Sequence, residues 1–114
     1  MDRVLQRQPS VLIADDHRLL LDTLAALLAP NFLVLRCLTD AGSLLATACE
    51  LRPDIALIDI NMPRLGGVEV ASRLRQHLPG CRLIFLTAKS APAVVGEAFA
   101  RGAAGFLLKT DTAE

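Results

Sequence analysis

The chain of 114 residues is long enough for one domain, and its 53% hydrophobic content predicts a core on two faces. Twelve Lys and Arg balance twelve Asp and Glu, so the chain lacks the positive excess that holds nucleic-acid phosphates, which argues against direct binding. The apolar stretch over residues 19–29 contains Asp22 and is too short to cross a membrane, and residues 1–9 lack a signal peptide's apolar core. We therefore expect a cytoplasmic protein.

Short apolar runs alternate with longer segments in which apolar residues recur at helical spacing. The runs predict strands over residues 11–14, 32–37, 55–58, 83–86 and 105–108. The segments between them predict helices over residues 16–28, 41–51, 68–78 and 93–101. The predicted buried faces carry Leu20, Leu24, Leu27 and Leu28 in the first helix, and Ala71, Leu74 and Leu78 in the third.

Continuous apolar strands are typical of a parallel sheet that is covered on both faces. Right-handed crossovers then give a doubly wound α/β fold, whose ligands bind at the carboxyl ends of the strands. The sequence shows no internal repeat, low-complexity segment or linker. We predict one domain over residues 1–114, with a core over about 10–109 and an N-terminal tail over 1–9.

The cysteines and histidines form no ligand pattern of their own. Cys37, Cys49 and Cys81 are odd in number and lack a C-x-x-C spacing, which argues against a disulfide framework and a zinc site. We predict that all three are small buried side chains. His17 and His77 share no metal-ligand spacing with another His or Cys, so we place both on the surface.

Charged and polar residues gather where the predicted strands end. These are Asp15 and Asp16 after the first strand, Asp59 after the third, Thr87 after the fourth and Lys109 after the fifth. Crowded carboxylates repel one another unless a cation neutralises them, and Mg²⁺ fits best because it leaves room for a phosphoryl group. Thr87 would donate a hydrogen bond to that group, and Lys109 would offset its charge.

Each residue also has an ordinary structural interpretation. Asp15 or Asp16 would cap the next helix, Thr87 would be a loop residue, and Lys109 a solvated charge. The combination favours a binding site. The composition supports it, because the chain has ten arginines and only two lysines, Lys89 and Lys109, both of which follow strands.

Four segments, VLIADDHRLLLDTL, PDIALIDINMP, LIFLTA and GAAGFLLK, resemble in order and spacing the receiver domain of bacterial two-component response regulators. The resemblance covers residues 10–109 and is closest to the branch with a LuxR-type helix-turn-helix output domain (NarL/FixJ-like). It implies a flavodoxin-like, CheY-like sheet with strand order 2-1-3-4-5. It also implies a phosphorelay protein that regulates transcription.

The resemblance assigns roles to individual residues. It makes Asp59 the phosphoacceptor for a sensor histidine kinase, with Mg²⁺ held by Asp15, Asp16, Asp59 and the backbone carbonyl of Asn61. It assigns phosphoryl contact to Thr87 and Lys109, switching to Thr87 and Phe106, and tuning of dephosphorylation to Asn61 and Lys89. The face formed by residues 91–105 would carry the signal.

The last residues have the form of a helix N-terminus, with Asp111 followed three positions later by Glu114. We expect residues 110–114 to begin a fifth helix that this chain does not contain. The chain should then either be less stable than a full receiver domain or associate through the face left bare, as a homodimer or in another self-associated form. DNA contact would come only through an output domain outside this chain, and we expect no membrane contact.

Two alternatives remain open. One is a receiver-like interaction module that works without phosphorylation, although the complete set of site residues argues against it. The other is a phosphatase of the haloacid-dehalogenase type, which requires D-x-D where this chain has Asp59-Ile60-Asn61. We expect a signalling domain that promotes its own phosphotransfer and dephosphorylation, not an enzyme.

Overall fold

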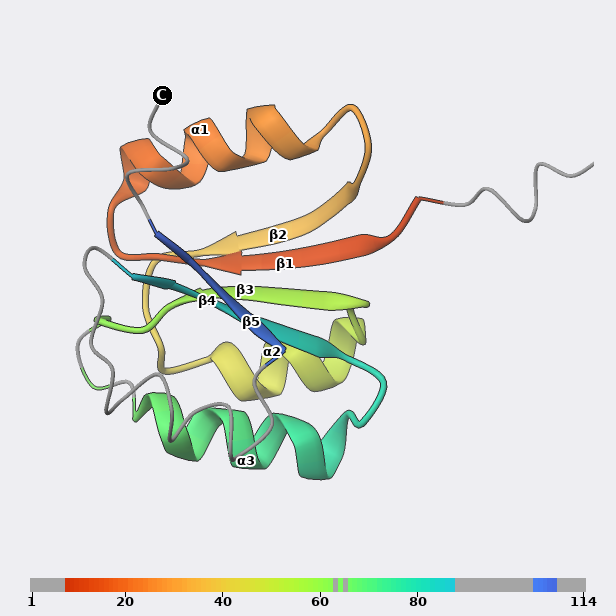
Figure 1. The fold of residues 1–114 in the computed structure, drawn as a ribbon, viewed down its shortest axis with the longest axis vertical. Helices are drawn as coiled ribbons and strands as arrows, with labels where there is room; N and C mark the ends of the chain where they lie inside the picture. Colours follow the sequence, from red (N-terminus) through yellow and green to blue (C-terminus); the bar gives the residue numbers. More distant parts are fainter. Residues whose placement is uncertain (1–7, 63, 65, 88–103, 109–114) are drawn as a thin grey trace, which may run out of the picture.

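The computed structural model describes residues 8–62, 64, 66–87 and 104–108 (Figure 1). Strands and helices alternate as predicted from β1 to β4. The described elements are, in order, β1 (Ser10–Ala14), α1 (Arg18–Leu28), β2 (Leu33–Leu38), α2 (Leu44–Leu51), β3 (Ile55–Asp59), α3 (Gly67–His77), β4 (Arg82–Thr87) and β5 (Gly105–Leu108). The helix predicted over residues 93–101 lies outside the described residues. None of the helices in the described ranges has the length and apolarity to span a membrane.

The strands form one parallel sheet with the order β2-β1-β3-β4-β5. This order confirms the predicted doubly wound, flavodoxin-like fold. Ala14 of β1 pairs with Ile58 of β3, and Ile58 pairs with Phe85 of β4. Because paired parallel strands run in the same direction, their carboxyl ends lie at one edge of the sheet. Residues that follow these pairs are therefore neighbours at that edge.

The sheet has helix α1 on one face and helices α2 and α3 on the other (Figure 1). Successive strand residues point to opposite faces, so each central strand contributes to two cores. Ile13 of β1 belongs to a buried cluster with Leu21 of α1. The next residue back, Leu12, belongs to a second cluster with Leu44 of α2 and Leu74 of α3. The predicted two-faced core is confirmed.

The buried face of α1 is rotated slightly from the predicted one. The helix buries Leu21 and Leu24, half-buries Leu20 and Leu28, and leaves Leu27 58% exposed. At 3.6 residues per turn, Leu21 and Leu27 lie about 60° from Leu24 on opposite sides of the helix. Because leucines occupy both sides, the sequence offered two apolar faces, and packing against the sheet favours the side of Leu21. The predicted burial of Leu27 is wrong.

Strand β2 lies at the edge of the sheet and is more exposed than its apolar sequence predicts. Leu33 is 53% exposed, and Cys37 is exposed. An edge strand pairs on one side only, here with β1. The prediction of three buried cysteines is therefore wrong for Cys37. Cys49 and Cys81 are half-buried and pack against the core cluster that contains Leu12.

At the amino ends of the strands, Ser10 and Asp54 tie β1 to β3. Oδ2 of Asp54 accepts hydrogen bonds from the backbone N–H of Ser10 at 2.8 Å and from its hydroxyl at 3.1 Å. The Ser10 Oγ in turn accepts the backbone N–H of Asp54 at 2.9 Å. This clamp fixes the two central strands at the edge opposite their carboxyl ends.

Candidate functional site

Three aspartates meet at the carboxyl edge of the sheet. Asp15 directly follows β1, and Asp59 is the last residue of the neighbouring strand β3. Parallel pairing of these strands makes the two residues neighbours. With Asp16 and His17, each offers one ligand atom, and these atoms all lie within 4.8 Å of one another. The structure thus brings together the three aspartates that the sequence places at this edge.

Two of these carboxylates are withdrawn from water. Asp15 and Asp59 are 0% and 1% exposed, whereas the side chain of Asp16 is 35% exposed. Burying carboxylates next to each other is unfavourable unless nearby groups or a cation compensate their charge. This edge therefore favours the binding of positive charge.

Asp15 also shapes the loop between β1 and α1. Its Oδ1 accepts the backbone N–H of His17 at 2.8 Å. Helix α1 begins at Arg18, and its N-cap residue is His17, which makes no side-chain capping hydrogen bond. The interpretation of Asp15 or Asp16 as a simple N-cap therefore does not hold. The Asp15 carboxylate instead fixes the turn that leads into the helix.

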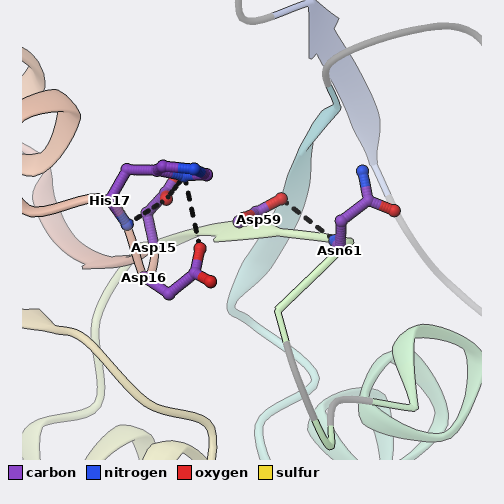
Figure 2. Close-up of polar contacts among 5 residues, drawn as sticks. All are labelled: Asp15, Asp16, His17, Asp59 and Asn61. Atoms are coloured by element: carbon purple, nitrogen blue, oxygen red, sulfur yellow. Dashed lines mark hydrogen bonds and ion pairs between the residues drawn. The ribbon is translucent and has the colours of Figure 1, made fainter.

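The ring of His17 lies against Asp15 and Asp16 (Figure 2). Its Nδ1 is 3.0 Å from Oδ1 of Asp15 and 3.3 Å from Oδ1 of Asp16. The side chain is 66% exposed, which confirms the predicted surface position. A spacing rule that compares only histidines and cysteines misses this contact, because the neighbours are carboxylates. The available signal was the position of His17 directly after two aspartates at a strand end. His77, at the end of α3, is exposed.

The segment after β3 turns back over Asp59. The backbone N–H of Ile60 donates to the carbonyl of Leu86 at 2.9 Å and extends the ladder between β3 and β4. The backbone N–H of Asn61 then donates to Oδ1 of Asp59 at 3.0 Å (Figure 2). The side chain of Asn61 is exposed. The main chain, and not that side chain, therefore orients the Asp59 carboxylate.

Thr87 ends the strand beside Asp59. It is the last residue of β4 and is 4% exposed. Since β4 pairs with β3, Thr87 lies at the same edge as Asp59. On its other side Thr87 pairs with Leu108, the last residue of β5. The buried hydroxyl thus lies at the edge where the sequence predicts it.

The other predicted site residues lie at or beyond the limits of the described structure. Lys89 and Lys109 are outside the described residues. The backbone of Phe106 lies in β5 and pairs with Phe85, but its side chain is also outside the described part.

Three carboxylates and an imidazole within reach of one point form a donor set for a divalent cation. Carboxylate oxygens are ligands that Mg²⁺ prefers, and three are present. The three carboxylates of this donor set therefore fit Mg²⁺ without the imidazole. A buried carboxylate beside a bound cation is also suited to act as a nucleophile toward a phosphoryl group, because the cation offsets the negative charge of the phosphoryl oxygens.

The sheet order defines the class of the fold, a flavodoxin-like domain. The acidic cluster at the ends of β1 and β3, where the strand order switches, is its candidate ligand site. The family model described as the response regulator receiver domain matches residues 11–114. The chain therefore belongs to the response regulator receiver domain family. The resemblance found in the sequence is confirmed.

Transcriptional regulators are among the most similar relatives. The chain is 35% identical over 104 residues to the probable transcriptional regulatory protein NarL of Mycobacterium tuberculosis, covering 90% of this chain and 48% of that protein. It is 34% identical over 106 residues to the transcriptional regulatory protein LnrK of Bacillus subtilis, covering 91% of this chain and 48% of that protein. The chain thus spans about half the length of the curated relatives it matches.

Solved structures agree with this placement. The signal receiver domain of the putative response regulator NarL from Mycobacterium tuberculosis superposes with a TM-score of 0.81 at 34% identity, covering 90% of this chain and 85% of that chain. A LuxR-family two-component response regulator from Aurantimonas superposes with a TM-score of 0.84 at 29% identity, covering 95% of this chain and 79% of that chain. The similarity is therefore to receiver domains of NarL and LuxR-family regulators.

Proposed function

We propose that this receiver domain accepts a phosphoryl group on Asp59 from a sensor histidine kinase, with Mg²⁺ held by Asp15, Asp16, Asp59 and the backbone carbonyl of Asn61. One observation carries the proposal: the ligand atoms of the three aspartates lie within 4.8 Å of one another around the buried end of β3. The membership of the chain in the receiver family supports it.

The chemistry requires a positioned nucleophile and charge compensation. A carboxylate oxygen of Asp59 attacks the phosphorus of a phosphohistidine, a P–O bond forms, the P–N bond breaks, and the imidazole leaving group takes up a proton. The Asn61 N–H, at 3.0 Å from Oδ1, holds the carboxylate in place during attack. Bound Mg²⁺ supplies positive charge for the phosphoryl oxygens.

The remaining residues would bind the phosphoryl group and transmit its presence. In this proposal the Thr87 hydroxyl and the Lys109 ammonium bind phosphoryl oxygens. Movement of Thr87 toward the group lets Phe106 turn inward and changes the face formed by residues 91–105. We assign tuning of the lifetime of the acyl phosphate to Asn61 and Lys89.

The proposal also says which partners the domain has. The relatives named as transcriptional regulators are about twice as long as this chain. We therefore assign DNA binding to an output domain outside these residues, and control of that domain to a phosphorylation-dependent homodimer in the cytoplasm. Light scattering of the chain before and after phosphorylation measures this association.

The proposal is tested by intact mass after incubation with acetyl phosphate, with and without Mg²⁺. Mass is a suitable readout because the chain has no Trp or Tyr to report binding by fluorescence. The samples are the unmodified chain, Asp59→Asn, and Asp22→Asn as a control on the exposed surface of α1. We expect one added phosphoryl group that needs Mg²⁺, is kept in Asp22→Asn and is lost in Asp59→Asn.

Other outcomes would change the function assigned to the domain. No mass gain in the unmodified chain would favour the interaction module that works without phosphate. Continuous release of phosphate from a generic phosphatase substrate, dependent on Asp59, would favour the phosphatase. A gain that persists in Asp59→Asn would place the acceptor elsewhere.

A further inference from the structure

We propose that His17 is a ligand for divalent transition-metal ions at this edge of the sheet, so that Co²⁺, Ni²⁺ or Zn²⁺ binds through imidazole and carboxylates, whereas Mg²⁺ binds without His17. The inference rests on the proposed cation site of Asp15, Asp16 and Asp59, and adds a fourth side chain and a second class of ion to it. The starting observation is that a His17 nitrogen belongs to the group of atoms within 4.8 Å of one another.

The separations between the atoms suit ligands that share one ion. With metal–ligand bonds of about 2.0–2.1 Å, neighbouring ligand atoms lie about 2.8–3.4 Å apart in octahedral or tetrahedral geometry. Nδ1 of His17 is 3.0 Å from Oδ1 of Asp15 and 3.3 Å from Oδ1 of Asp16. A metal ion between these atoms would be within bonding distance of the imidazole nitrogen and of both carboxylates.

The backbone holds the ring where a ligand is needed. The His17 N–H donates to Asp15 Oδ1 at 2.8 Å, and Leu21 N–H donates to the His17 carbonyl at 3.1 Å. His17 is thus fixed between a buried carboxylate and the first turn of α1. Such preorganisation lowers the entropy cost of binding an ion. With 66% of the side chain exposed, water can reach the ion and complete its coordination.

The imidazole determines which ions bind more tightly when His17 is a ligand. Imidazole nitrogen suits Zn²⁺, Cu²⁺, Fe²⁺ and Ni²⁺, whereas Mg²⁺ takes carboxylate, carbonyl and water oxygens. Loss of His17 should therefore weaken transition-metal binding and leave Mg²⁺ binding nearly unchanged. His77 is the other histidine of the chain and is exposed at the end of α3. It is a matched control for nonspecific binding to a surface imidazole.

The test is calorimetric titration of the tag-free chain, His17→Gln and His77→Gln with Co²⁺ and, separately, with Mg²⁺ at neutral pH. We expect His17→Gln to weaken Co²⁺ binding by at least about tenfold, in line with the loss of a metal-supporting group. Mg²⁺ affinity should stay within about twofold, because oxygen ligands supply that site. His77→Gln should match the unmodified chain. In NMR spectra of the unmodified chain, Co²⁺ should shift the ring signals of His17 but not those of His77.

Four results would overturn the proposal. One is unchanged Co²⁺ affinity in His17→Gln. Another is an equal loss of Co²⁺ and Mg²⁺ affinity, which would make His17 a positioning residue for the aspartates. The third is a chain that binds Mg²⁺ but not Co²⁺, which would leave the proposed phosphoacceptor function intact. A chain that binds neither ion would refute both this inference and the proposed Mg²⁺ site.

Discussion

Oδ1 of Asp59 accepts the backbone N–H of Asn61, two residues further along the chain, at 3.0 Å. One oxygen of the buried carboxylate is therefore held by the main chain, and the exposed side chain of Asn61 is free to vary without loss of this bond. The backbone of residue 61 therefore orients the Asp59 carboxylate, and its side chain makes a separate contribution at the exposed surface beside it.

Two substitutions at position 61 test this separation. Asn61→Ala keeps the N–H, so we expect it to retain phosphorylation and to change the free energy of unfolding by about 0.5 kcal/mol or less. Asn61→Pro removes the donor from a buried carboxylate and should cost about 1–3 kcal/mol and slow phosphorylation. Urea unfolding followed by circular dichroism, together with intact mass, measures both effects. If the two variants have the same free energy of unfolding and the same phosphorylation rate, the hydrogen bond from the backbone N–H contributes to neither.

Removing one buried carboxylate should stabilise the metal-free protein. Asp15 and Asp59 are buried side by side, so Asp59→Asn removes a desolvated charge and lowers the repulsion. We expect a higher melting temperature than that of the unmodified chain, by roughly 4–8 °C for each 1 kcal/mol gained. The measurement is thermal unfolding followed by circular dichroism in the presence of a chelator.

With Mg²⁺ present, the unmodified chain should have a higher melting temperature than Asp59→Asn, because the ion stabilises the unmodified chain. An ion at about 100 times its dissociation constant adds about 2.7 kcal/mol to the stability of the folded state that binds it. Asp59→Asn should gain much less, whereas the surface control Asp22→Asn should gain as much as the unmodified chain. Equal stabilisation of Asp59→Asn and the unmodified chain by Mg²⁺ would exclude Asp59 as a ligand.

The Ser10–Asp54 clamp should contribute more stability than the exposed ion pair on α3. Asp54→Ala removes the carboxylate that accepts both Ser10 donors, at 2.8 and 3.1 Å. We expect a loss of about 1–2 kcal/mol, because these hydrogen bonds involve a charged group. Arg73→Ala breaks the Arg73–Glu69 pair, 3.0 Å apart and exposed, which should cost about 0.5 kcal/mol or less. The midpoints of urea unfolding show which of the two variants loses more stability. A larger loss in Arg73→Ala than in Asp54→Ala would contradict the stronger contribution assigned to the clamp.

Cys81 should make the stability depend on pH in alkaline solution. Burial, with the charge of Asp54 as a second cause, raises the pKa of Cys81 from 9.0 to about 11, against the effect of a hydrogen bond with the Ala56 backbone. Because the folded pKa is the higher one, the stabilising effect of the protonated thiol is complete below pH 9 and is lost between pH 9 and about 11.

The comparison with Cys81→Ala isolates this contribution. Over that pH range, the melting temperature of the unmodified chain should fall more steeply than that of Cys81→Ala, which has no thiol to titrate. Parallel curves for the two proteins would show that the thiol has the same pKa in the folded and unfolded states.

Much of the fold and of the site could be predicted from sequence because it depends on strong local patterns. Continuous apolar strands specified the parallel sheet, and the burial of Ala71 and Leu74 on α3 and of Leu78 at its C-cap follows from helical spacing. The sequence could predict that Asp15 and Asp59 lie close together, because this follows once their strands are parallel neighbours in the sheet. These features are set by periodicity and chain direction, which a sequence displays directly.

Other features depend on contacts that the sequence does not display. The leucine-rich α1 could face the sheet through Leu21 or Leu27, and only packing decides between them. Cys37 is exposed because its strand is at the sheet edge, a position that a short apolar run does not reveal. The approach of His17 to Asp16 depends on a turn fixed by a hydrogen bond to Asp15, which composition and spacing do not encode.

The most direct test of the central claim is to locate the phosphoryl group chemically in the unmodified chain. Borohydride reduces an aspartyl phosphate to homoserine, and peptide mass spectrometry then identifies the residue that was converted. After incubation with acetyl phosphate and Mg²⁺, we predict homoserine at position 59 and unchanged aspartate at positions 15 and 16. Homoserine at either of those positions, or at none, would contradict the assignment of Asp59 as the phosphoacceptor.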